Sequence, residues 1–150
     1  MENTDLIRNL VYTYPERLDR GDFEGVGELF AEGRLRCVSP GITEDRYYVG
    51  KREVADFYRE TVCVYDGSPA TRHLITNSII DIAHAGLEAR VCSYFLVIQC
   101  LPDFPLQLIA SGRYWDVLAC LEGAWLFQEK VIFADYLADV SRHARVLNAS

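Results

Sequence analysis

Hydrophobic side chains recur at every fourth position near the start of the chain. This spacing predicts an amphipathic helix over residues 4–20, with Thr4 available as its N-terminal cap. Pro15 lies inside the pattern and has no backbone N–H to donate, so the sequence predicts a kink or a break near residues 11–14. The positions that define the apolar stripe are Leu6, Leu10, Tyr14 and Leu18.

Two further helical stretches follow the first. A run over residues 23–32 begins after Asp22, a favourable N-cap, and ends at Gly33. After a short predicted strand over residues 35–38, a third amphipathic run covers residues 51–64. The first two predicted helices therefore form a helical hairpin, and the third follows the strand.

From residue 71 onward the pattern changes to β-branched and aromatic residues separated by short turn sequences. This pattern predicts four consecutive antiparallel strands. Strands of this length must coil and bend rather than lie flat. Helices followed by such strands predict an α+β domain, with three N-terminal helices packed on one face of an antiparallel sheet. The predicted strands cover residues 71–82, 87–100, 106–120 and 124–136.

Both faces of the predicted sheet are apolar. In its second strand, Tyr94 and Leu96 alternate with Phe95 and Val97, so hydrophobic side chains point to either side. Three helices cannot cover two faces. Homodimerisation through the outer sheet face is the simplest way to remove the second face from water.

Composition is that of a folded, acidic domain. The chain has 150 residues, 50% of them hydrophobic, and a formal net charge of −7. These values predict one domain over residues 1–150 and exclude a disordered chain. The negative charge excludes nucleic acid and anionic membranes as expected partners. A polar N-terminus, the lack of a long apolar run and five isolated cysteines predict a cytoplasmic protein.

The sequence carries no motif for a nucleotide or a metal. It lacks the Gly-rich phosphate loops and the GxSxG elbow. A metal site needs several ligands that converge on one ion. Because His84 falls in a predicted turn and His143 in a polar, charged tail, neither is expected to share a site with His73. The prediction is therefore no metal and no cofactor.

His73 is the one histidine inside an apolar-leaning strand. A neutral imidazole there can serve as general acid or base near neutral pH, or it can be a structural histidine whose nitrogens are satisfied by neighbours. A carboxylate that orients the ring favours catalysis. Asp19 and Asp22, between the first two predicted helices, are the candidates, although Asp22 also suits a helix cap.

Polar groups that could assist such chemistry are mainly tyrosines. Phenols placed in an apolar cavity can polarise a carbonyl, although most tyrosines pack in cores and interfaces. Arg113 and Asp116 flank one of them and are interpreted as an ion pair at a sheet edge. The candidate phenols are Tyr14, Tyr47, Tyr48, Tyr94 and Tyr114.

Four motifs, in the predicted order of helices and strands, resemble the SnoaL-like group of the nuclear-transport-factor-2-like superfamily. The resemblance implies a strongly coiled sheet wrapped against three helices into a cone-shaped barrel, one deep apolar pocket and commonly a dimer. Its members include scytalone dehydratase, polyketide cyclases, steroid isomerases and the small subunits of ring-hydroxylating dioxygenases. The four motifs are Leu18-Asp-Arg-Gly-Asp-Phe23, Arg72-His-Leu-Ile-Thr-Asn77, Gly112-Arg-Tyr-Trp-Asp116 and Gly123-Ala-Trp-Leu-Phe127. The closing stretch Ala138-Asp-Val-Ser-Arg-His143 also resembles this group.

The resemblance also implies roles for individual residues. Asp19 and His73 match the aspartate–histidine pair of scytalone dehydratase, in which histidine removes a proton next to a carbonyl and aspartate orients it. The second histidine of that enzyme falls at Ser93, and the tyrosine before its aspartate falls at Leu18, so the two-histidine mechanism is not expected here. The expected ligand contacts are Tyr14, Tyr48, Phe57, Ser93, Phe95 and Tyr114.

Two functions remain open at this stage. The first is a cofactor-free lyase, isomerase or cyclase that acts on a small apolar ketone, phenol or polyketide-like ligand, with His73 as base and Asp19 as its orienter. The second is a non-catalytic ligand-binding protein, or the small subunit of a ring-hydroxylating dioxygenase-type assembly. One scaffold supports both, so the fold cannot choose between them.

Overall fold

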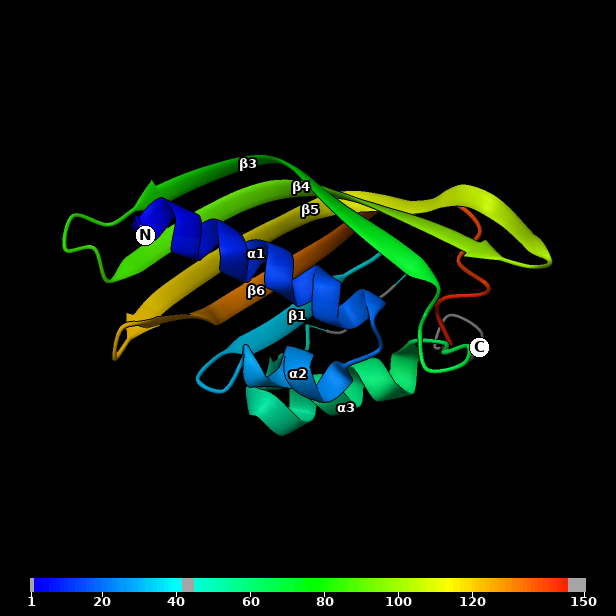
Figure 1. Ribbon diagram of the computed structural model, residues 1–150, viewed down its shortest axis with the longest axis horizontal. Coiled ribbons are helices and arrows are strands. Elements are labelled where there is room, and N and C mark those ends of the chain that lie inside the picture. The colour runs from blue at the N-terminus through cyan, green and yellow to red at the C-terminus, as the bar shows by residue number, and fades with distance from the viewer. Residues whose placement is uncertain (1, 42–44, 146–150) are drawn as a thin grey trace.

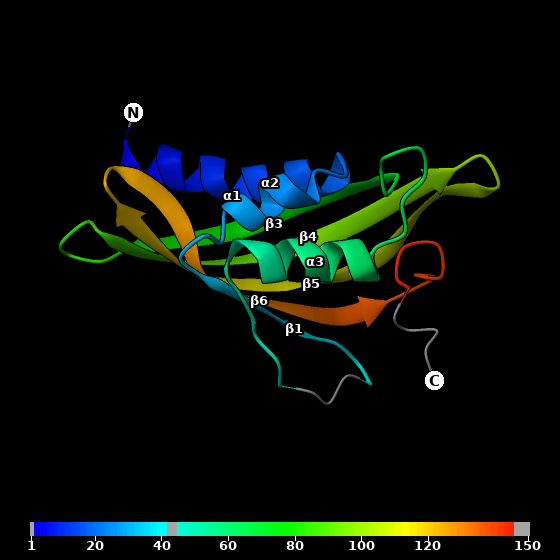
Figure 2. The same ribbon diagram turned by 90° about the horizontal axis from the view of Figure 1, so that it is seen from below.

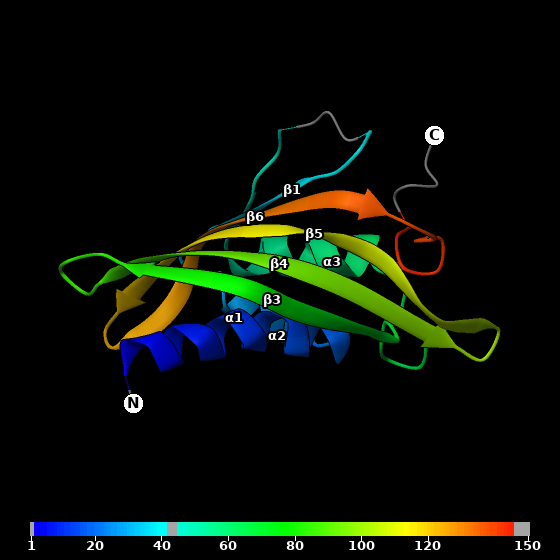
Figure 3. The ribbon, with the colours of Figure 1, turned by 90° about the horizontal axis from the view of Figure 1, so that it is seen from above.

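Three helices lie along one face of a curved sheet in the computed structural model, which describes residues 2–41 and 45–145 (Figure 1). α1 spans Asn3–Asp19, α2 spans Phe23–Glu28 and α3 spans Gly50–Thr61. Figures 2 and 3 show all three helices on the same side of the sheet, while the other side is left uncovered. The α+β class, with its three N-terminal helices on a coiled sheet, is therefore confirmed.

The sheet has six strands in the spatial order β2-β1-β6-β5-β4-β3. β1 runs parallel to β6, and every other neighbouring pair is antiparallel. Two details of the predicted fold are therefore wrong. The sheet is mixed rather than purely antiparallel, and its edge strands β2 and β3 do not pair, so the sheet does not close into a barrel. The strands are β1 (Arg34–Val38), β2 (Tyr48–Val49), β3 (Thr71–Ile82), β4 (Glu88–Leu101), β5 (Phe104–Leu121) and β6 (Ala124–Leu137).

Bulges bend the long strands. In β3 the register shifts between Thr76 and Ile79, where Asn77 adopts the left-handed backbone conformation with φ of 53°. Further register shifts interrupt the pairing of β4 with β5 and of β5 with β6. Because each bulge adds local twist, the sheet curls around the helices instead of lying flat. Its inner face thereby becomes concave and can hold both a core and a cavity.

The helices differ from their prediction at their ends. α1 continues through the buried Pro15 without a break, and Glu2 rather than Thr4 occupies its N-cap position. α2 ends at Glu28, four residues earlier than expected. The Asp22 cap is confirmed, since its side chain accepts a hydrogen bond of 2.9 Å from the backbone N–H of Gly25.

The core lies between the helices and the concave face of the sheet. Tyr14 of α1 lies at the centre of this core and is 1% exposed. Its ring meets four other aromatic rings, three of them edge to face, the arrangement that ring quadrupoles favour. This packing fixes α1 against the sheet. The four neighbouring rings belong to Phe30, Tyr58, Tyr114 and Phe127.

The convex outer face of the sheet carries exposed apolar side chains, as the alternation in the sequence predicts. Trp115 is half exposed and packs edge-on against Phe133 of the next strand. No helix in the described part of the chain covers this face (Figure 3). Its large exposed side chains include Leu74, Tyr94, Leu108, Trp115 and Tyr136.

Candidate functional site

A cavity of about 560 Å³ lies between α1, α3 and the concave face of the sheet, and the chain after β6 forms part of its wall. Most of its lining side chains are aliphatic or aromatic, which is typical of sites for small ligands. The polar residues of the lining include the phenols Tyr14 and Tyr58 and the histidines His73 and His143, and the ionisable residues Arg46 and Glu60 also line the cavity. Any acid–base chemistry in this cavity therefore depends on these side chains.

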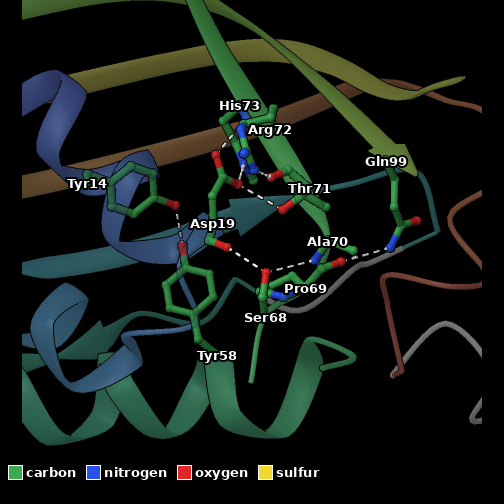
Figure 4. Close-up of polar contacts among 10 residues, drawn as sticks. All are labelled: Tyr14, Asp19, Tyr58, Ser68, Pro69, Ala70, Thr71, Arg72, His73 and Gln99. Carbon is green, nitrogen blue, oxygen red and sulfur yellow. Dashed lines mark hydrogen bonds and ion pairs between the residues drawn. The ribbon is translucent and has the colours of Figure 1, made fainter. Parts of the chain in front are cut away.

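Asp19 and His73 are hydrogen-bonded to each other at the cavity wall (Figure 4). Oδ1 of Asp19 lies 2.6 Å from Nδ1 of His73, and both side chains are nearly buried, 11% and 6% exposed respectively. Oδ2 of the same carboxylate accepts the backbone N–H of His73 at 2.8 Å. His73 lines the cavity, whereas Asp19 lies behind it. The aspartate thus holds both the backbone and the ring of the histidine.

Local structure delivers Asp19 to this position. It is the last residue of α1, and its backbone carbonyl accepts a hydrogen bond of 2.9 Å from the Ser68 hydroxyl. The turn that follows depends on Gly21, which has a φ of +79° and packs so close to the Gly67 carbonyl that an added Cβ would lie 2.0 Å from its oxygen. The end of α1 and the segment before β3 are therefore fixed to each other.

Hydrogen bonds decide the charge of Asp19. Burial alone would raise the pKa of this carboxyl, but the ring and backbone of His73 and the Thr71 hydroxyl, at 2.8 Å, lower its pKa below the ordinary value. The carboxylate is thus ionised near neutral pH, and it accepts the proton of Nδ1. In the neutral imidazole this leaves Nε2 as the nitrogen with a free lone pair.

Three phenols surround the cavity next to this pair. The hydroxyls of Tyr14 and Tyr58 are hydrogen-bonded to each other, and among the described residues the Tyr114 hydroxyl has no hydrogen-bond partner. Burial raises the pKa of all three well above the usual value, so each stays protonated. One proton of the Tyr14–Tyr58 pair is used in their own hydrogen bond, which leaves the other proton of the pair and that of Tyr114 for a ligand. Such donors can stabilise negative charge that develops on a ligand oxygen.

Beneath the Tyr114 ring lies a second acid–base pair that the sequence did not predict. Lys130 of β6 and Asp116 of β5 are directly opposite each other, 3.1 Å apart, and both side chains are fully buried. The Lys130 ammonium lies 3.6 Å from the centre of the Tyr114 ring, while Phe95 stacks with that ring at 4.4 Å. Tyr114 is thereby held by a cation and by a parallel ring.

The predicted ion pair between Arg113 and Asp116 is wrong. Residues three apart on a strand point to opposite faces, so Arg113 lies on the outer face and Asp116 on the inner face. Arg113 instead makes two hydrogen bonds to the carboxylate of Asp135 on the neighbouring strand, at 2.8 and 3.0 Å. Asp116 faces Lys130 in the core.

The sequence analysis missed His143 and Tyr58, two polar residues that line the cavity. The chain after β6 folds back toward the cavity, so the centre of the His143 ring lies 6.4 Å from that of the His73 ring. The sequence analysis expected His143 in a polar tail instead. Burial and the neighbouring His73 lower the pKa of His143 to about 4. A sequence signal did exist, because Val140 and Ala144, the apolar neighbours of His143 in this tail, also line the cavity.

Most of the predicted ligand contacts reach the cavity. Ser93 does not line it; this buried residue lies opposite Tyr114 in the sheet, and its hydroxyl has no hydrogen-bond partner among the described residues. No group of three or more histidine, cysteine, aspartate or glutamate side chains in the described part of the chain could hold a metal ion. The predicted contacts that do line the cavity are Tyr14, Tyr48, Phe57, Phe95 and Tyr114.

Comparison with known protein families identifies the domain. Residues 1–131 match the SnoaL-like domain. The chain belongs to this family. No curated protein matches it significantly. Within residues 2–41 and 45–145, no helix is long and apolar enough to cross a membrane.

Solved structures share the nuclear-transport-factor-2-like fold. A proposed scytalone dehydratase from Novosphingobium aromaticivorans superimposes with a TM-score of 0.69 at 21% identity, covering 91% of this chain and 86% of its own. ActVI-ORFA from Streptomyces coelicolor gives 0.67 at 20% identity, with 88% and 97% covered. The beta subunit of a proposed aromatic-ring-hydroxylating dioxygenase from N. aromaticivorans gives 0.69 at 18% identity, with 89% and 90% covered. At these identities the likeness establishes the fold and leaves the chemistry to the site.

Proposed function

We propose that this SnoaL-like protein is a cofactor-free lyase or isomerase, in the manner of the dehydratases and cyclases of its superfamily. Its substrate would be a small, largely apolar ketone or phenol. The observation that carries the proposal is the Asp19–His73 pair, in which an oriented imidazole faces an apolar cavity and a buried carboxylate holds it. Such chemistry needs only proton transfer in a site from which water is excluded.

The proposed reaction begins at a carbon next to a carbonyl. Nε2 of His73 takes a proton from this carbon, and Asp19 stabilises the imidazolium that forms. The C–H electrons move into the enolate, whose oxygen is stabilised by a buried phenol, with Tyr114 the best candidate because its hydroxyl has no other partner in the described structure. In a β-hydroxy ketone the C–O bond then breaks, and the leaving hydroxide takes the proton from His73 to form water.

Proton exchange tests the first step without knowledge of the natural substrate. 2-Tetralone is apolar and enolisable, and the exchange of its α-protons in D₂O can be followed by NMR. We expect His73→Gln to slow the protein-catalysed exchange by about 10²–10⁴-fold, because a general base contributes that much. The matched control is His84→Gln, since His84 is exposed in the β3–β4 turn and exchange should not change.

A second candidate function makes the same site a binding pocket only. The likeness to the dioxygenase beta subunit, which covers about nine-tenths of both chains, favours it. In that case 2-tetralone binds to the wild-type protein, and its α-protons exchange no faster than in buffer. Equal exchange rates in wild type and His73→Gln would likewise remove His73 from catalysis.

The partner that we propose is a second copy of this chain, bound through the outer sheet face. The supporting observation is the row of exposed apolar side chains there, because large apolar patches are rarely left in water. Light scattering after gel filtration should give a dimer, and Trp115→Glu with Leu74→Glu should give a folded monomer. Leu87→Glu, an equally apolar and exposed site in the β3–β4 turn, is the control. A monomeric wild type would exclude this dimer.

The cysteines support a reducing compartment. All five are free in the structure, and none is paired in a disulfide. We therefore keep a cytoplasmic location as part of the proposal. Fractionation of the source cells would test it, and recovery of the protein outside the cytoplasm would exclude it.

A further inference from the structure

Aromatic side chains of the cavity wall form a row that runs from the interior toward solvent. At its inner end the buried phenols of Tyr14 and Tyr58 are hydrogen-bonded to each other (Figure 4). The Tyr58 ring meets the half-buried Phe57 ring with 5.0 Å between their centres, and the Phe57 ring meets that of Tyr48 at 4.4 Å. All four side chains line the cavity, so a flat apolar ligand can pack along this aromatic row.

Arg46 lies at the outer end of the aromatic row. The central carbon of its guanidinium is 4.6 Å from the centre of the Tyr48 ring, which is a cation–π contact. Arg46 is exposed, and it lines the same cavity as the buried Tyr14 and Tyr58. It therefore marks the end of the cavity that reaches solvent, which we call the mouth.

The guanidinium of Arg46 forms no ion pair within the described part of the chain, unlike the two arginines of β1. Arg34 pairs with Glu129 at 2.8 Å, and Arg36 pairs with Asp45, the residue next to Arg46. A guanidinium has five N–H donors in a planar fork that matches the two oxygens of a carboxylate. The acid nearest to Arg46 in sequence is thus already used, and the fork of Arg46 can accept a ligand.

The charges around Arg46 favour an anion with a single charge. Glu60, near the end of α3, is exposed and also lines the cavity. The whole chain has a net charge of −7. Both oppose a phosphate, which carries close to two negative charges at neutral pH, more strongly than a carboxylate, which carries one. The mouth is therefore better suited to a carboxylate.

We propose that Arg46 binds a carboxylate of the ligand, at the end of the molecule far from the carbon that faces His73. This inference rests on the proposed function, because the nearly buried His73 defines which end of the ligand reacts. The substrate is then an amphipathic acid, whose apolar body packs along the aromatic row while its carboxylate stays at the mouth. There the carboxylate keeps part of its hydration, so its desolvation costs little.

Two ketones that differ by one carboxylate test the inference. 2-Tetralone is neutral, and 6-carboxy-2-tetralone carries the acid on the ring that lacks the ketone. In calorimetric titrations at pH 7.5 and low salt, we expect Arg46→Met, which keeps the aliphatic stem, to weaken binding of the acid by about five- to tenfold. Binding of 2-tetralone should weaken by less than about twofold. Arg46→Lys should restore part of the loss, because it keeps the charge but not the fork.

Two further variants serve as matched controls. Arg52→Met removes the charge of an exposed arginine of α3 that does not line the cavity, so binding of both probes should stay within about twofold of wild type. Glu60→Gln removes the acid at the cavity and should strengthen binding of 6-carboxy-2-tetralone by about twofold. Since Arg46 is exposed, Arg46→Met should unfold at the same urea concentration as wild type.

Three outcomes of the titrations would overturn the inference. Equal weakening of both probes by Arg46→Met would make Arg46 a packing residue, and unchanged binding of the acid would remove Arg46 from the site. The phosphate ester of 6-hydroxy-2-tetralone tests the choice of anion. If Arg46→Met weakens binding of this ester more than that of the acid, the bound group is a phosphate and the carboxylate assignment is wrong.

Exchange of the α-protons of 6-carboxy-2-tetralone in D₂O separates this inference from the proposed function. Binding that depends on Arg46, in a wild type that exchanges these protons no faster than buffer, would keep the inference for a binding pocket and exclude the enzyme. Exchange that depends on His73, together with binding that does not depend on Arg46, would keep the enzyme and exclude the inference.

Discussion

Two buried aspartates, each next to a cationic or potentially cationic side chain, lie in different parts of this molecule. Asp19 joins the end of α1 to His73 of β3, and Asp116 joins β5 to Lys130 of β6. The first pair keeps a small exposed fraction and lies at the cavity wall, whereas the second is completely enclosed. Both would be candidates for acid–base chemistry on residue type alone.

The two carboxylates differ in the number of hydrogen bonds that they accept. Asp19 accepts from the Thr71 hydroxyl and from both the backbone and the ring of His73, so its pKa is lowered despite burial. Burial raises the pKa of Asp116, and Lys130 alone opposes the rise. Burial likewise lowers the pKa of Lys130. The direction therefore depends on the balance between the two effects: the hydrogen bonds outweigh burial at Asp19, whereas burial outweighs the contact with Lys130 at Asp116.

Access to the cavity separates their functions. His73 lines the cavity and can exchange a proton with a ligand, whereas Lys130 and Asp116 do not line it. Lys130 lies instead against the rings of Tyr114 and Tyr14, at 3.6 and 4.3 Å from their centres. A cation against aromatic faces stabilises their positions. The enclosed pair thus positions the phenols, and the pair at the wall is placed for chemistry.

The largest effect that we expect is on stability, from Lys130→Met. This change leaves Asp116 buried without its partner, which should lower the free energy of unfolding by about 3–5 kcal/mol in urea titrations at pH 7.5. The loss should shrink toward pH 4. The folded-state pKa of Asp116 is then raised far above its unfolded value of about 3.9, so stability is full below that value and falls as pH rises.

A double variant provides the control for this prediction. Asp116→Leu combined with Lys130→Met removes both charges, so most of the stability should return and the pH dependence should disappear. If the single variant is as stable as wild type at pH 7.5, the pair is not enclosed as described. If the double variant is no better than the single one, lost packing of the lysine stem explains the defect instead.

Local sequence patterns predicted the elements of the fold but not all of their pairing. Helical spacing and β-branched runs located three helices and four long strands to within a few residues at most ends. The parallel pairing of β1 with β6 could not be predicted, because their paired residues are about 95 positions apart, as for Arg34 and Glu129. Such a long-range pairing depends on how the whole sheet curls, which no short window records.

The site was predictable only where a motif marked it. Asp19 and His73 followed from the family resemblance, and the structure brings them together. Lys130 was hidden by a register shift, since an extra residue in β6 between Phe127 and Glu129 places Lys130 on the same face as Phe127. His143 ends the closing stretch of the resemblance, but its place in the site was not predicted, because this polar tail reaches the cavity only through backbone contacts with the end of α3.

Asp19→Asn should have a smaller effect on stability than Lys130→Met and should mainly slow proton transfer. The two variants therefore separate a catalytic role from a structural one. The introduced amide can donate to Nδ1 of His73, which moves the ring proton to Nε2 and removes the lone pair that takes the substrate proton. We expect 2-tetralone exchange to slow by about 10²-fold, equivalent to about 2.7 kcal/mol. The amide oxygen can still accept from the His73 backbone, and the Thr71 hydroxyl can accept from the amide nitrogen. The free energy of unfolding should therefore fall by only about 1 kcal/mol.

Asp116→Asn is the matched change in the enclosed pair and should give the opposite result. It leaves the buried Lys130 without its charged partner, so the free energy of unfolding should fall by more than in Asp19→Asn. The rate of 2-tetralone exchange per folded molecule should stay within about tenfold of wild type. Both rates are measured at saturating 2-tetralone, with the folded fraction determined by circular dichroism. Equal losses of exchange in the two variants would mean that the catalytic defect follows from general loosening of the core. A selective loss in Asp19→Asn assigns proton transfer to the pair that reaches the cavity.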